Sequence, residues 1–400
     1  MRRGLLVAVM LLAVVGPALS AEPVAPPQTR ALNGAFLEYL PPPPRPGVVC
    51  VVDRGVPLTP DTEPLIDARV AADAGGSLGD AADEHGSFVV GVLGAPRNGW
   101  GGVGLWPRAR VVSVAVSAAA TGEDLARAVV RCLLSQPLVV SLSLSDDTGS
   151  AALASAVELA RDQGVSVVVA AGNTGGDLVA PANLPGVLAV SASDPGTGRL
   201  CPFSARSPVA LSAPGCGVLV AGADGAVAAR SGTSLAAPQA SALLAALRAY
   251  APQLDAASAE AILRQTARTV TAGEPPVLDA AAAFRAAGLS ALVDISSERV
   301  HALGNLSWQV SPRAPRPRVI TWRRTGGTII VRLSASPRGR VVWGGPGPVT
   351  RLDRAAIRVG LRARPRRIWL VATGPDLRPS PRYWLTVPAL LRTLAPEGVS

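Results

Sequence analysis

Short apolar runs alternate with helix-like segments between residues 47 and 288. The runs are mostly continuous in apolar residues, which is typical of parallel strands buried on both faces. They cover residues 48–52, 111–116, 138–144, 165–171 and 187–190. Helical candidates cover residues 86–93, 122–134, 150–163, 234–250, 257–267 and 279–287. Because strand and helix alternate, the pattern predicts the α/β class with a mostly parallel central sheet.

The pattern changes on either side of this region. After Gly288, short β-like runs are separated by proline and glycine clusters, and five of the seven tryptophans lie there. Residues 289–400 are therefore expected to form a separate, small β-rich domain. Residues 21–46 are rich in proline and predict an extended polyproline linker. The β-like runs cover residues 318–322, 328–333, 340–343 and 367–373.

The first 20 residues predict an export signal. Arg2 and Arg3 precede an apolar stretch over residues 5–15, and the sequence ALS at 18–20 resembles a small-residue cleavage site before Ala21. The stretch is shorter than the ~18 apolar residues of a membrane span, so a secretory signal peptide is favoured over an uncleaved anchor. The chain is therefore expected to be exported to the periplasm or the extracellular space.

Charge is distributed unevenly along the chain. The 400 residues include 38 basic residues, all of them arginines, and 28 acidic ones, for a formal net charge of +10. Residues 289–400 hold 19 arginines and 5 acidic residues. A basic region of this kind contacts an anionic surface or partner, or is simply a solvated face. The solvated face is the favoured interpretation, and no specific nucleic acid is expected.

Four cysteines are present, and export permits disulfides. Cys201 and Cys216 are close in sequence within a loop-rich stretch, which favours their pairing. Cys50 lies in a predicted core strand and is either an unpaired apolar residue or the partner of Cys132. The cysteine and histidine spacings match no zinc site, and the chain has only two histidines, so no histidine-based metal centre is expected.

Three segments carry candidate chemistry. Asp53 closes an apolar run, at the strand end where ligands gather in parallel α/β sheets. His85 precedes a helix start, and imidazole is the natural general base near neutral pH. Ser234 begins a helix within SGTSLAAP, where the helix dipole favours developing negative charge. Each has an ordinary structural alternative: a turn cap for Asp53, a structural histidine for His85 and an N-cap for Ser234.

The combination of these segments resembles the subtilisin-like serine proteases, the subtilase family. The chain order Asp53, His85, Ser234 is that of the family, and SGTSLAAP matches its GTSxAxP signature in full. The sequence VVVAAGNTG resembles the strand and loop that present the family's oxyanion-hole asparagine, and PANLPGVLAV resembles the segment that follows. The resemblance spans residues 47–288 and implies the subtilisin-like three-layer sandwich.

The resemblance also implies a role for each site residue. Ser234 is expected to be the nucleophile, His85 the general base and acid, and Asp53 the group that orients the imidazole. Asn173 and the backbone N–H of Ser234 are expected to form the oxyanion hole. The expected activity is that of a secreted serine endopeptidase that cleaves peptide bonds through an acyl-enzyme intermediate. The edges of the substrate pocket match Ser143, Leu144, Ser145, Ala170, Ala171 and Gly172.

The chain departs from the family pattern at several positions. Arg54 stands where a small hydroxyl residue is usual, and Phe88 replaces the second histidine of HGTHVAG. Ser145 and Asp146 stand where the pocket edge usually carries a glycine pair. These departures motivate an alternative: a catalytically weak or inactive subtilase that acts as a binding or scaffold protein at the cell envelope.

The resemblance further bears on cofactors and partners. Catalysis is expected to need no cofactor, whereas structural calcium is common in the family. The expected partner is a peptide or protein substrate, and the chain is expected to be a monomer. Residues 21–46 are too short for the folded inhibitory propeptide of many relatives, a trait shared with the exported mycosin-type members. Candidate calcium ligands, without a diagnostic spacing, are Asp61, Glu63, Asp73 and Asp80.

Overall fold

The computed structural model of the protein describes residues 26–296, apart from 74, 80–82, 145–149 and 208–209, and seven strands between residues 319 and 385. The chain divides into two compact units, Met1–Leu306 and Ser307–Ser400. None of the described helices combines the length and the apolar character that a membrane span requires. The predicted signal peptide lies outside the described residues, as do Asp80, Ser145 and Asp146.

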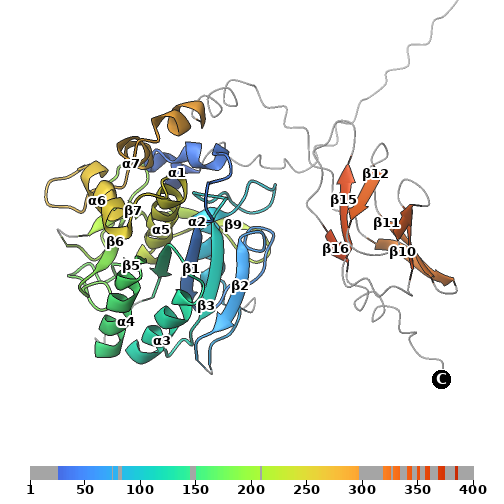
Figure 1. Ribbon diagram of the computed structural model, residues 1–400, viewed down its shortest axis with the longest axis horizontal. Helices are drawn as coiled ribbons and strands as arrows, with labels where there is room; N and C mark the ends of the chain where they lie inside the picture. The colour runs from blue at the N-terminus through green and yellow to red at the C-terminus, as the bar shows by residue number, and fades with distance from the viewer. Residues whose placement is uncertain are drawn as a thin grey trace, which may run out of the picture. The chain divides into compact units, whose positions relative to one another are not determined.

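Seven parallel strands form the central sheet of the first unit (Figure 1). Their spatial order is β2-β3-β1-β4-β5-β6-β7, so the sheet extends in both directions from β1. Ligand sites of such sheets lie at the carboxyl ends of the strands where the order reverses. The strands are β1 (Val48–Asp53), β2 (Ile66–Ala71), β3 (Arg110–Ala115), β4 (Val139–Leu142), β5 (Ser166–Ala170), β6 (Val187–Ser193) and β7 (Leu211–Pro214).

Helices cover both faces of this sheet. On one face, α3 and α4 pack with the strands in an apolar cluster that includes Val129 and Val157. On the other face, α2, α5, α6 and α7 contribute to a larger cluster that includes Leu93 and Leu243. This arrangement confirms the predicted three-layer α/β sandwich. The helices are α2 (His85–Gly94), α3 (Gly122–Leu133), α4 (Ala151–Asp162), α5 (Thr233–Tyr250), α6 (Ala256–Thr266) and α7 (Ala280–Ala286).

Helix α5 is the most deeply buried of these helices. Every one of its residues except Ser234 is buried. The helix contacts α2 and strands β4 to β7, and its many alanines allow close packing between helix and sheet. The buried surroundings fix the helix, and therefore fix the position of Ser234 in its first turn.

Residues 26–46 are packed against the core, which differs from the extended linker predicted for 21–46. They contain α1 (Pro27–Ala31) and a 3-10 helix (Ala35–Tyr39). The prolines suggested a linker, but the apolar residues between them recur with helical spacing and reach the core. The fully or almost fully buried side chains are Leu32, Phe36, Leu37 and Leu40.

Two further contacts hold this N-terminal segment in place. The ring of Phe36 lies edge-on to Phe284 of α7, with 5.1 Å between the centroids. Glu38 accepts two hydrogen bonds from the guanidinium of Arg97, at 2.5 and 2.9 Å. The segment is therefore an integral layer of the first unit and not a tether.

Some strands of this unit have weak sequence signals. The edge strand β2 carries Asp67 and Arg69 between its apolar residues, and none of its residues is fully buried. Strand β7 is only four residues long and ends in Pro214. A two-stranded antiparallel hairpin, β8 (Val218–Ala221) and β9 (Val227–Arg230), precedes α5. These elements lack the long apolar runs that reveal the central strands.

Two disulfides cross-link the first unit. Cys50 in β1 is bonded to Cys132 in α3, with 5.6 Å between the Cα atoms. Cys201 is bonded to Cys216, with 6.2 Å between the Cα atoms. The second pairing confirms the favoured prediction, and the first resolves the two alternatives for Cys50.

The described parts of the second unit are all strands, in agreement with the predicted β-rich region. β10, β11, β14 and β13 form a four-stranded sheet, and β12, β15 and β16 form a three-stranded one. All described pairings in these sheets are antiparallel. The strands are β10 (Val319–Thr325), β11 (Thr328–Leu333), β12 (Arg340–Gly344), β13 (Val349–Arg351), β14 (Ala356–Gly360), β15 (Ile368–Thr373) and β16 (Tyr383–Leu385).

Candidate active site

The sequence-predicted residues converge on the carboxyl edge of the central sheet. Asp53 is the last residue of β1, and His85 is the first residue of α2. Ser234 lies in the first turn of α5, which packs against α2. The contact of His85 with Asp53 and the packing of α5 against α2 thus join three segments that are far apart in the sequence.

The carboxylate of Asp53 contacts the imidazole of His85 directly. The Nδ1 atom of His85 lies 2.8 Å from Oδ1 and 3.0 Å from Oδ2 of Asp53. The Asp53 side chain is fully buried, and its Oδ1 also accepts the backbone N–H of Arg54 at 2.8 Å. A buried carboxylate requires such partners because burial otherwise penalises its charge.

Two glycines allow this approach. A Cβ atom on Gly86 would lie 1.9 Å from the carbonyl oxygen of Gly55, so only glycine lets the first turn of α2 lie against the loop after β1. Gly55 itself has a φ of 101°, a conformation that favours glycine. The glycines beside Asp53 and His85 therefore position the histidine on the carboxylate.

The charges around His85 raise its pKa. Burial of the imidazole lowers the pKa, but the charge of Asp53 and the hydrogen bond to it raise the pKa, with a further contribution from Asp83. The charge of Arg54 acts in the opposite direction, and the pKa of His85 ends above 6.5. The imidazolium form is therefore stabilised at this position, as a general base that passes through that form requires.

Asn173 lies beside Ser234 and is held by Thr233. Its Oδ1 atom accepts hydrogen bonds from the backbone N–H of Thr233 at 2.9 Å and from its hydroxyl at 3.1 Å. A Cβ atom on Gly232 would lie 3.1 Å from Oγ of Ser234 and 3.9 Å from Nδ2 of Asn173. The amide nitrogen of Asn173 and the hydroxyl of Ser234 therefore face the same small space.

Thr233 is a positioning residue that the sequence analysis did not single out. Besides its contacts with Asn173, its hydroxyl accepts the backbone N–H of Gly172 at 3.1 Å. It thereby ties the loop after β5 to the first turn of α5. Its position inside the motif SGTSLAAP, directly before Ser234, is the sequence feature that could have indicated this role.

The predicted pocket edges follow two neighbouring parallel strands. Ser143 and Leu144 come directly after β4, and Ala171 and Gly172 come directly after β5, whose last residue is Ala170. Ser143 also donates a hydrogen bond from its hydroxyl to the carbonyl oxygen of Ser234 at 3.2 Å. The described pocket residues thus flank the start of α5. Ser145 lies outside the described residues.

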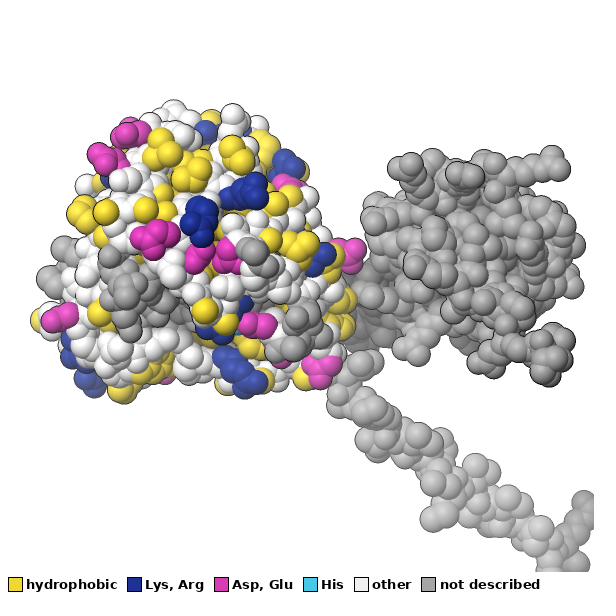
Figure 2. Space-filling view, turned by 90° about the horizontal axis from the view of Figure 1, so that it is seen from below, with side chains coloured by type: hydrophobic (Ala, Val, Ile, Leu, Met, Phe, Trp, Pro, Cys, Tyr) yellow, Lys and Arg dark blue, Asp and Glu magenta, His cyan; other side chains and the backbone are white. Residues whose placement is uncertain are grey.

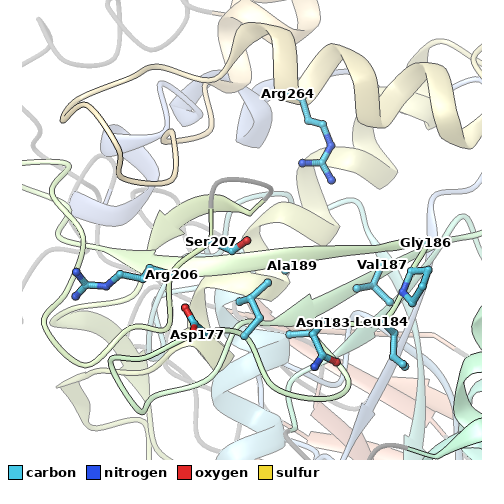
Figure 3. Close-up of a pocket in the computed structure, with 12 residues that line it drawn as sticks. Asp177, Asn183, Leu184, Gly186, Val187, Ala189, Arg206, Ser207 and Arg264 are labelled. Carbon is cyan, nitrogen blue, oxygen red and sulfur yellow. The ribbon is translucent and has the colours of Figure 1, made fainter.

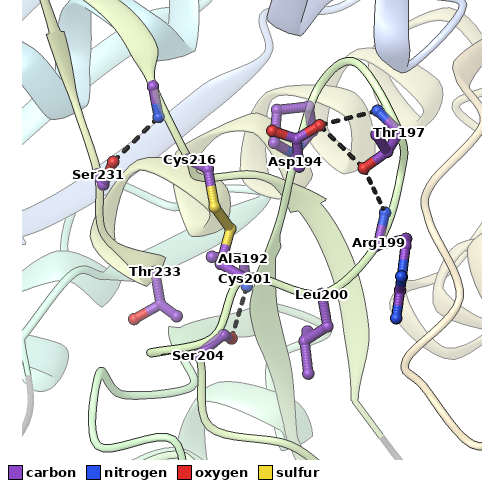
Figure 4. The surroundings of a disulfide bond; sticks show 12 residues. Ala192, Asp194, Thr197, Arg199, Leu200, Cys201, Ser204, Cys216, Ser231 and Thr233 are labelled. Carbon is purple, nitrogen blue, oxygen red and sulfur yellow. Dashed lines mark hydrogen bonds between the residues drawn. A yellow bond between two sulfur atoms is a disulfide. The ribbon is translucent and has the colours of Figure 1, made fainter.

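The Cys201–Cys216 disulfide lies close to the segment that leads into α5 (Figure 4). The carbonyl oxygen of Gly215 accepts the backbone N–H of Gly232 at 2.8 Å. The hydroxyl of Ser231 accepts the backbone N–H of Gly217 at 3.0 Å. The cross-linked loop therefore supports the backbone just before Ser234.

The described carboxylates do not assemble a metal site. Across the part of the chain that the structure describes, no group of three His, Cys, Asp or Glu side chains is placed to hold a metal ion. Asp61 accepts hydrogen bonds from Asn98 and from the Gly102 backbone, and Asp73 accepts the backbone N–H groups of Gly75 and Ser117. Both carboxylates thus accept hydrogen bonds from other groups of the first unit.

A cavity of about 580 Å³ lies apart from these residues (Figure 3). Its lining includes Leu184 and Val187 and none of the predicted site residues. Arg264 extends from α6 toward it. The cavity is therefore a separate feature of the first unit and not the substrate pocket predicted from the sequence.

Comparison with known proteins places the chain in a family. The subtilase family, peptidase S8, matches residues 46–287, and the chain belongs to this family. The minor extracellular protease Epr of Bacillus subtilis (strain 168) is 32% identical over 228 residues, which are 55% of this chain and 34% of that protein. The thermostable alkaline protease of Halalkalibacterium halodurans is 30% identical over 213 residues, 51% of this chain and 57% of that protein. The chain thus spans only part of the length of these relatives.

Solved structures show the same architecture. A mutant of the protease domain of PatA superposes with a TM-score of 0.54 at 25% identity, over 60% of this chain and 94% of that chain. A protease from Pseudoalteromonas arctica superposes with a TM-score of 0.59 at 23% identity, over 66% of this chain and 98% of that chain. Both likenesses agree with the subtilisin-like fold of the first unit.

Proposed function

We propose that the chain is an exported serine endopeptidase with Asp53, His85 and Ser234 as its catalytic triad. The observation that carries the proposal is the contact between the buried Asp53 carboxylate and Nδ1 of His85, at 2.8 and 3.0 Å. Ser234 supports it as the one residue of α5 that is not buried. Membership of the subtilase family and similarity to an extracellular protease and an alkaline protease support it further.

In this proposal, Asp53 selects the tautomer of His85. Nδ1 of His85 carries the proton and donates to Asp53, which leaves Nε2 to accept the proton of the Ser234 hydroxyl. Oγ of Ser234 forms a bond to the substrate carbonyl carbon, and the carbonyl oxygen becomes an oxyanion. His85 then returns the proton to the leaving amine as the C–N bond breaks, and an acyl-enzyme results. Water, deprotonated by His85 in the same way, hydrolyses the ester and restores Ser234.

The oxyanion is assigned to Asn173 and the start of α5. Thr233 engages Oδ1 of Asn173, so the amide nitrogen Nδ2 is the atom that faces the space beside Ser234. The backbone N–H of Ser234 and the positive end of the α5 dipole add to the same stabilisation. Such donors act on charge that develops during the reaction, so they lower the barrier and not merely the substrate Kd.

A fluorophosphonate probe tests the proposal because it phosphonylates only an activated serine. The wild-type protein should be labelled, and the Ser234→Ala variant should not. Equal signals from the two proteins would contradict the proposal. A folded wild-type protein without label would favour the alternative of an inactive subtilase with a binding or scaffold role.

We further propose the organisation around the peptidase domain. Residues 1–20 act as the signal peptide, the first unit with its packed segment 26–46 forms the peptidase domain, and the unit Ser307–Ser400 forms a second domain. The 19 arginines among residues 289–400 form either the favoured solvated face or a contact with an anionic surface. Salt-dependent binding of the full chain to anionic vesicles would support the contact, whereas no binding, or equal binding to neutral vesicles, would support the solvated face.

A further inference from the structure

Two arginines lie around the first turn of α2, the helix that begins at His85. Arg54 directly follows Asp53, and Nη1 of Arg54 lies 3.8 Å from Oδ2 of Asp83, two residues before His85. The Arg54 side chain is 46% exposed, so its guanidinium remains accessible from solution. Its charge acts on His85, whose pKa it lowers against the effect of Asp53. A cation is therefore within electrostatic range of the reacting imidazole.

The second arginine reaches the same helix from another element. Arg230 ends β9, four residues before Ser234, and its guanidinium carbon lies 6.0 Å from the ring centroid of Phe88. Phe88 is in the first turn of α2, three residues after His85 and hence on the same side of the helix. A cation–π contact holds the guanidinium near the aromatic ring. Arg230 is exposed, so it too is open to solution.

We propose that Arg54 and Arg230 are specificity-determining residues that select substrates with an acidic side chain next to the cleaved bond. This inference rests on the proposed peptidase function. A scissile carbonyl must lie within reach of both Ser234 and His85, so the side chains that flank it come close to the groups beside His85. A substrate carboxylate there pairs with a guanidinium, whose planar fork of donors matches carboxylate geometry.

The acidic side chains around His85 leave room for such a pairing. Asp53 is buried against His85, and Glu84 accepts the backbone N–H of Ala223. Asp83 is the partner of Arg54, but its side chain is 38% exposed and the contact is 3.8 Å long. Exposed pairs of this kind are weak, so a substrate carboxylate can compete with Asp83 for the guanidinium.

One face of the first unit carries charges of both signs. On the face shown in Figure 2, arginines and carboxylates of the first unit are interspersed and form no region of one sign. A general attraction for acidic proteins is therefore not expected from this face.

Matched peptides test the inference. Each set differs by a single Glu, Gln or Lys, placed in turn at the two positions on either side of the cleaved bond. Values of kcat/KM are measured for wild type, Arg54→Glu and Arg230→Glu. The control Arg131→Glu makes the same change of charge at an exposed position in the last turn of α3, on the other face of the sheet. Fluorophosphonate labelling of each protein is measured in parallel.

Wild type should prefer Glu over Gln about 2- to 5-fold at one or more of these positions, the scale of an exposed ion pair. Arg54→Glu and Arg230→Glu should each reduce this preference or reverse it in favour of Lys, and Arg131→Glu should keep it. The preference should fall in 1 M salt because screening weakens exposed charges.

Two results would overturn the inference, and they are distinguishable. Labelled, active enzymes without a preference for Glu, or with a preference that neither substitution changes, would reject the inference and leave the proposed function intact. Absence of labelling and cleavage in the wild type would reject the proposed function, and the inference with it.

Discussion

Both carboxylate oxygens of Asp53 contact the same ring nitrogen of His85, at 2.8 and 3.0 Å, from a fully buried position. The contact fixes the orientation of the imidazole and the nitrogen that carries its proton. The proposed chemistry therefore requires the negative charge of the Asp53 carboxylate, and a neutral side chain of the same shape should not replace it.

Asp53→Asn should therefore lower kcat by about 10,000-fold, because the neutral amide no longer selects the tautomer with the proton on Nδ1. Hydrolysis of a peptide substrate measures this effect, with thermal unfolding as the check on folding. The matched control is Asp67→Asn, which removes an exposed carboxylate of β2 that pairs with Arg110. An equal loss in both variants would contradict the role of Asp53.

The raised pKa of His85 predicts the acid limb of the pH–rate profile. The unprotonated imidazole is the active base, so kcat/KM should rise with pH through a value above 6.5. Asp83→Asn removes an anion that raises the pKa, and should move the limb to lower pH. Arg54→Ser removes a cation that lowers the pKa, and should move it to higher pH. If the acid limb moved in the same direction in both variants, Asp83 and Arg54 would not act on the pKa of His85 as described.

The same shift has a consequence for stability. A histidine whose pKa is raised on folding contributes stability that is fully present below its unfolded value of about 6.5. That contribution is lost as the pH rises through the folded pKa. The difference in unfolding free energy between the wild type and His85→Gln should therefore decrease as the pH rises from about 6.5 through the folded pKa. Urea unfolding at a series of pH values measures this difference. A difference that stays constant with pH would be inconsistent with the raised pKa.

Substitutions can separate the proposed donor role of Asn173 from its hydrogen bonds with Thr233. Asn173→Asp keeps an oxygen acceptor for Thr233 but removes the Nδ2 donor, whereas Asn173→Leu removes both. Both variants should lose about 100- to 1,000-fold in kcat, a magnitude known for this kind of donor from this same family. The leucine variant should additionally lower Tm, because the N–H and hydroxyl of Thr233 lose their acceptor. Unchanged kcat in either variant would argue against a donor role.

The Cys50–Cys132 disulfide joins β1 to α3 and closes a long loop of the chain. The two cysteines are 82 positions apart in the sequence and both are fully buried. Replacing both with alanine should lower the free energy of unfolding by about 2–5 kcal/mol, because the unfolded chain regains the freedom that the cross-link removes. Urea unfolding under oxidising conditions measures the loss, and the same measurement under reducing conditions should show little difference between variant and wild type.

The N-terminal segment should contribute directly to stability. Phe36→Ala removes a ring that is 2% exposed and packed on Phe284, and should cost about 3–5 kcal/mol of unfolding free energy. Pro42→Ala, at an exposed position of the same segment, should change it by less than about 0.5 kcal/mol. Equal and small effects would mean that the segment is not part of the folded core.

The sequence predicted the elements whose signal is local. The continuous apolar runs identify strands β1, β3, β4, β5 and β6, since strands buried on both faces have no polar alternation. The motif around Ser234 and the chain order of Asp53 and His85 identify the candidate chemistry because a few residues at fixed places suffice for it.

Features that depend on partners distant in the sequence were not predictable in this way. The contact of Thr233 with Asn173 and the pairing of Arg54 with Asp83 arise only when separate loops meet at the sheet edge. The N-terminal helices were missed because proline content outweighed the spacing of four apolar residues. Strand β2 was missed because charged side chains are tolerated at an exposed edge.

The packed N-terminal segment also determines where the folded unit begins. A protein cut to the limits of the family match, 46–287, would lack Phe36, which packs on Phe284 of α7, and its apolar neighbours in the same cluster. It would also lack Val293, which is 1% exposed and belongs to the same apolar cluster. A fragment expected to fold as the whole domain therefore includes at least residues 32–293, beyond both ends of the region that defines the family.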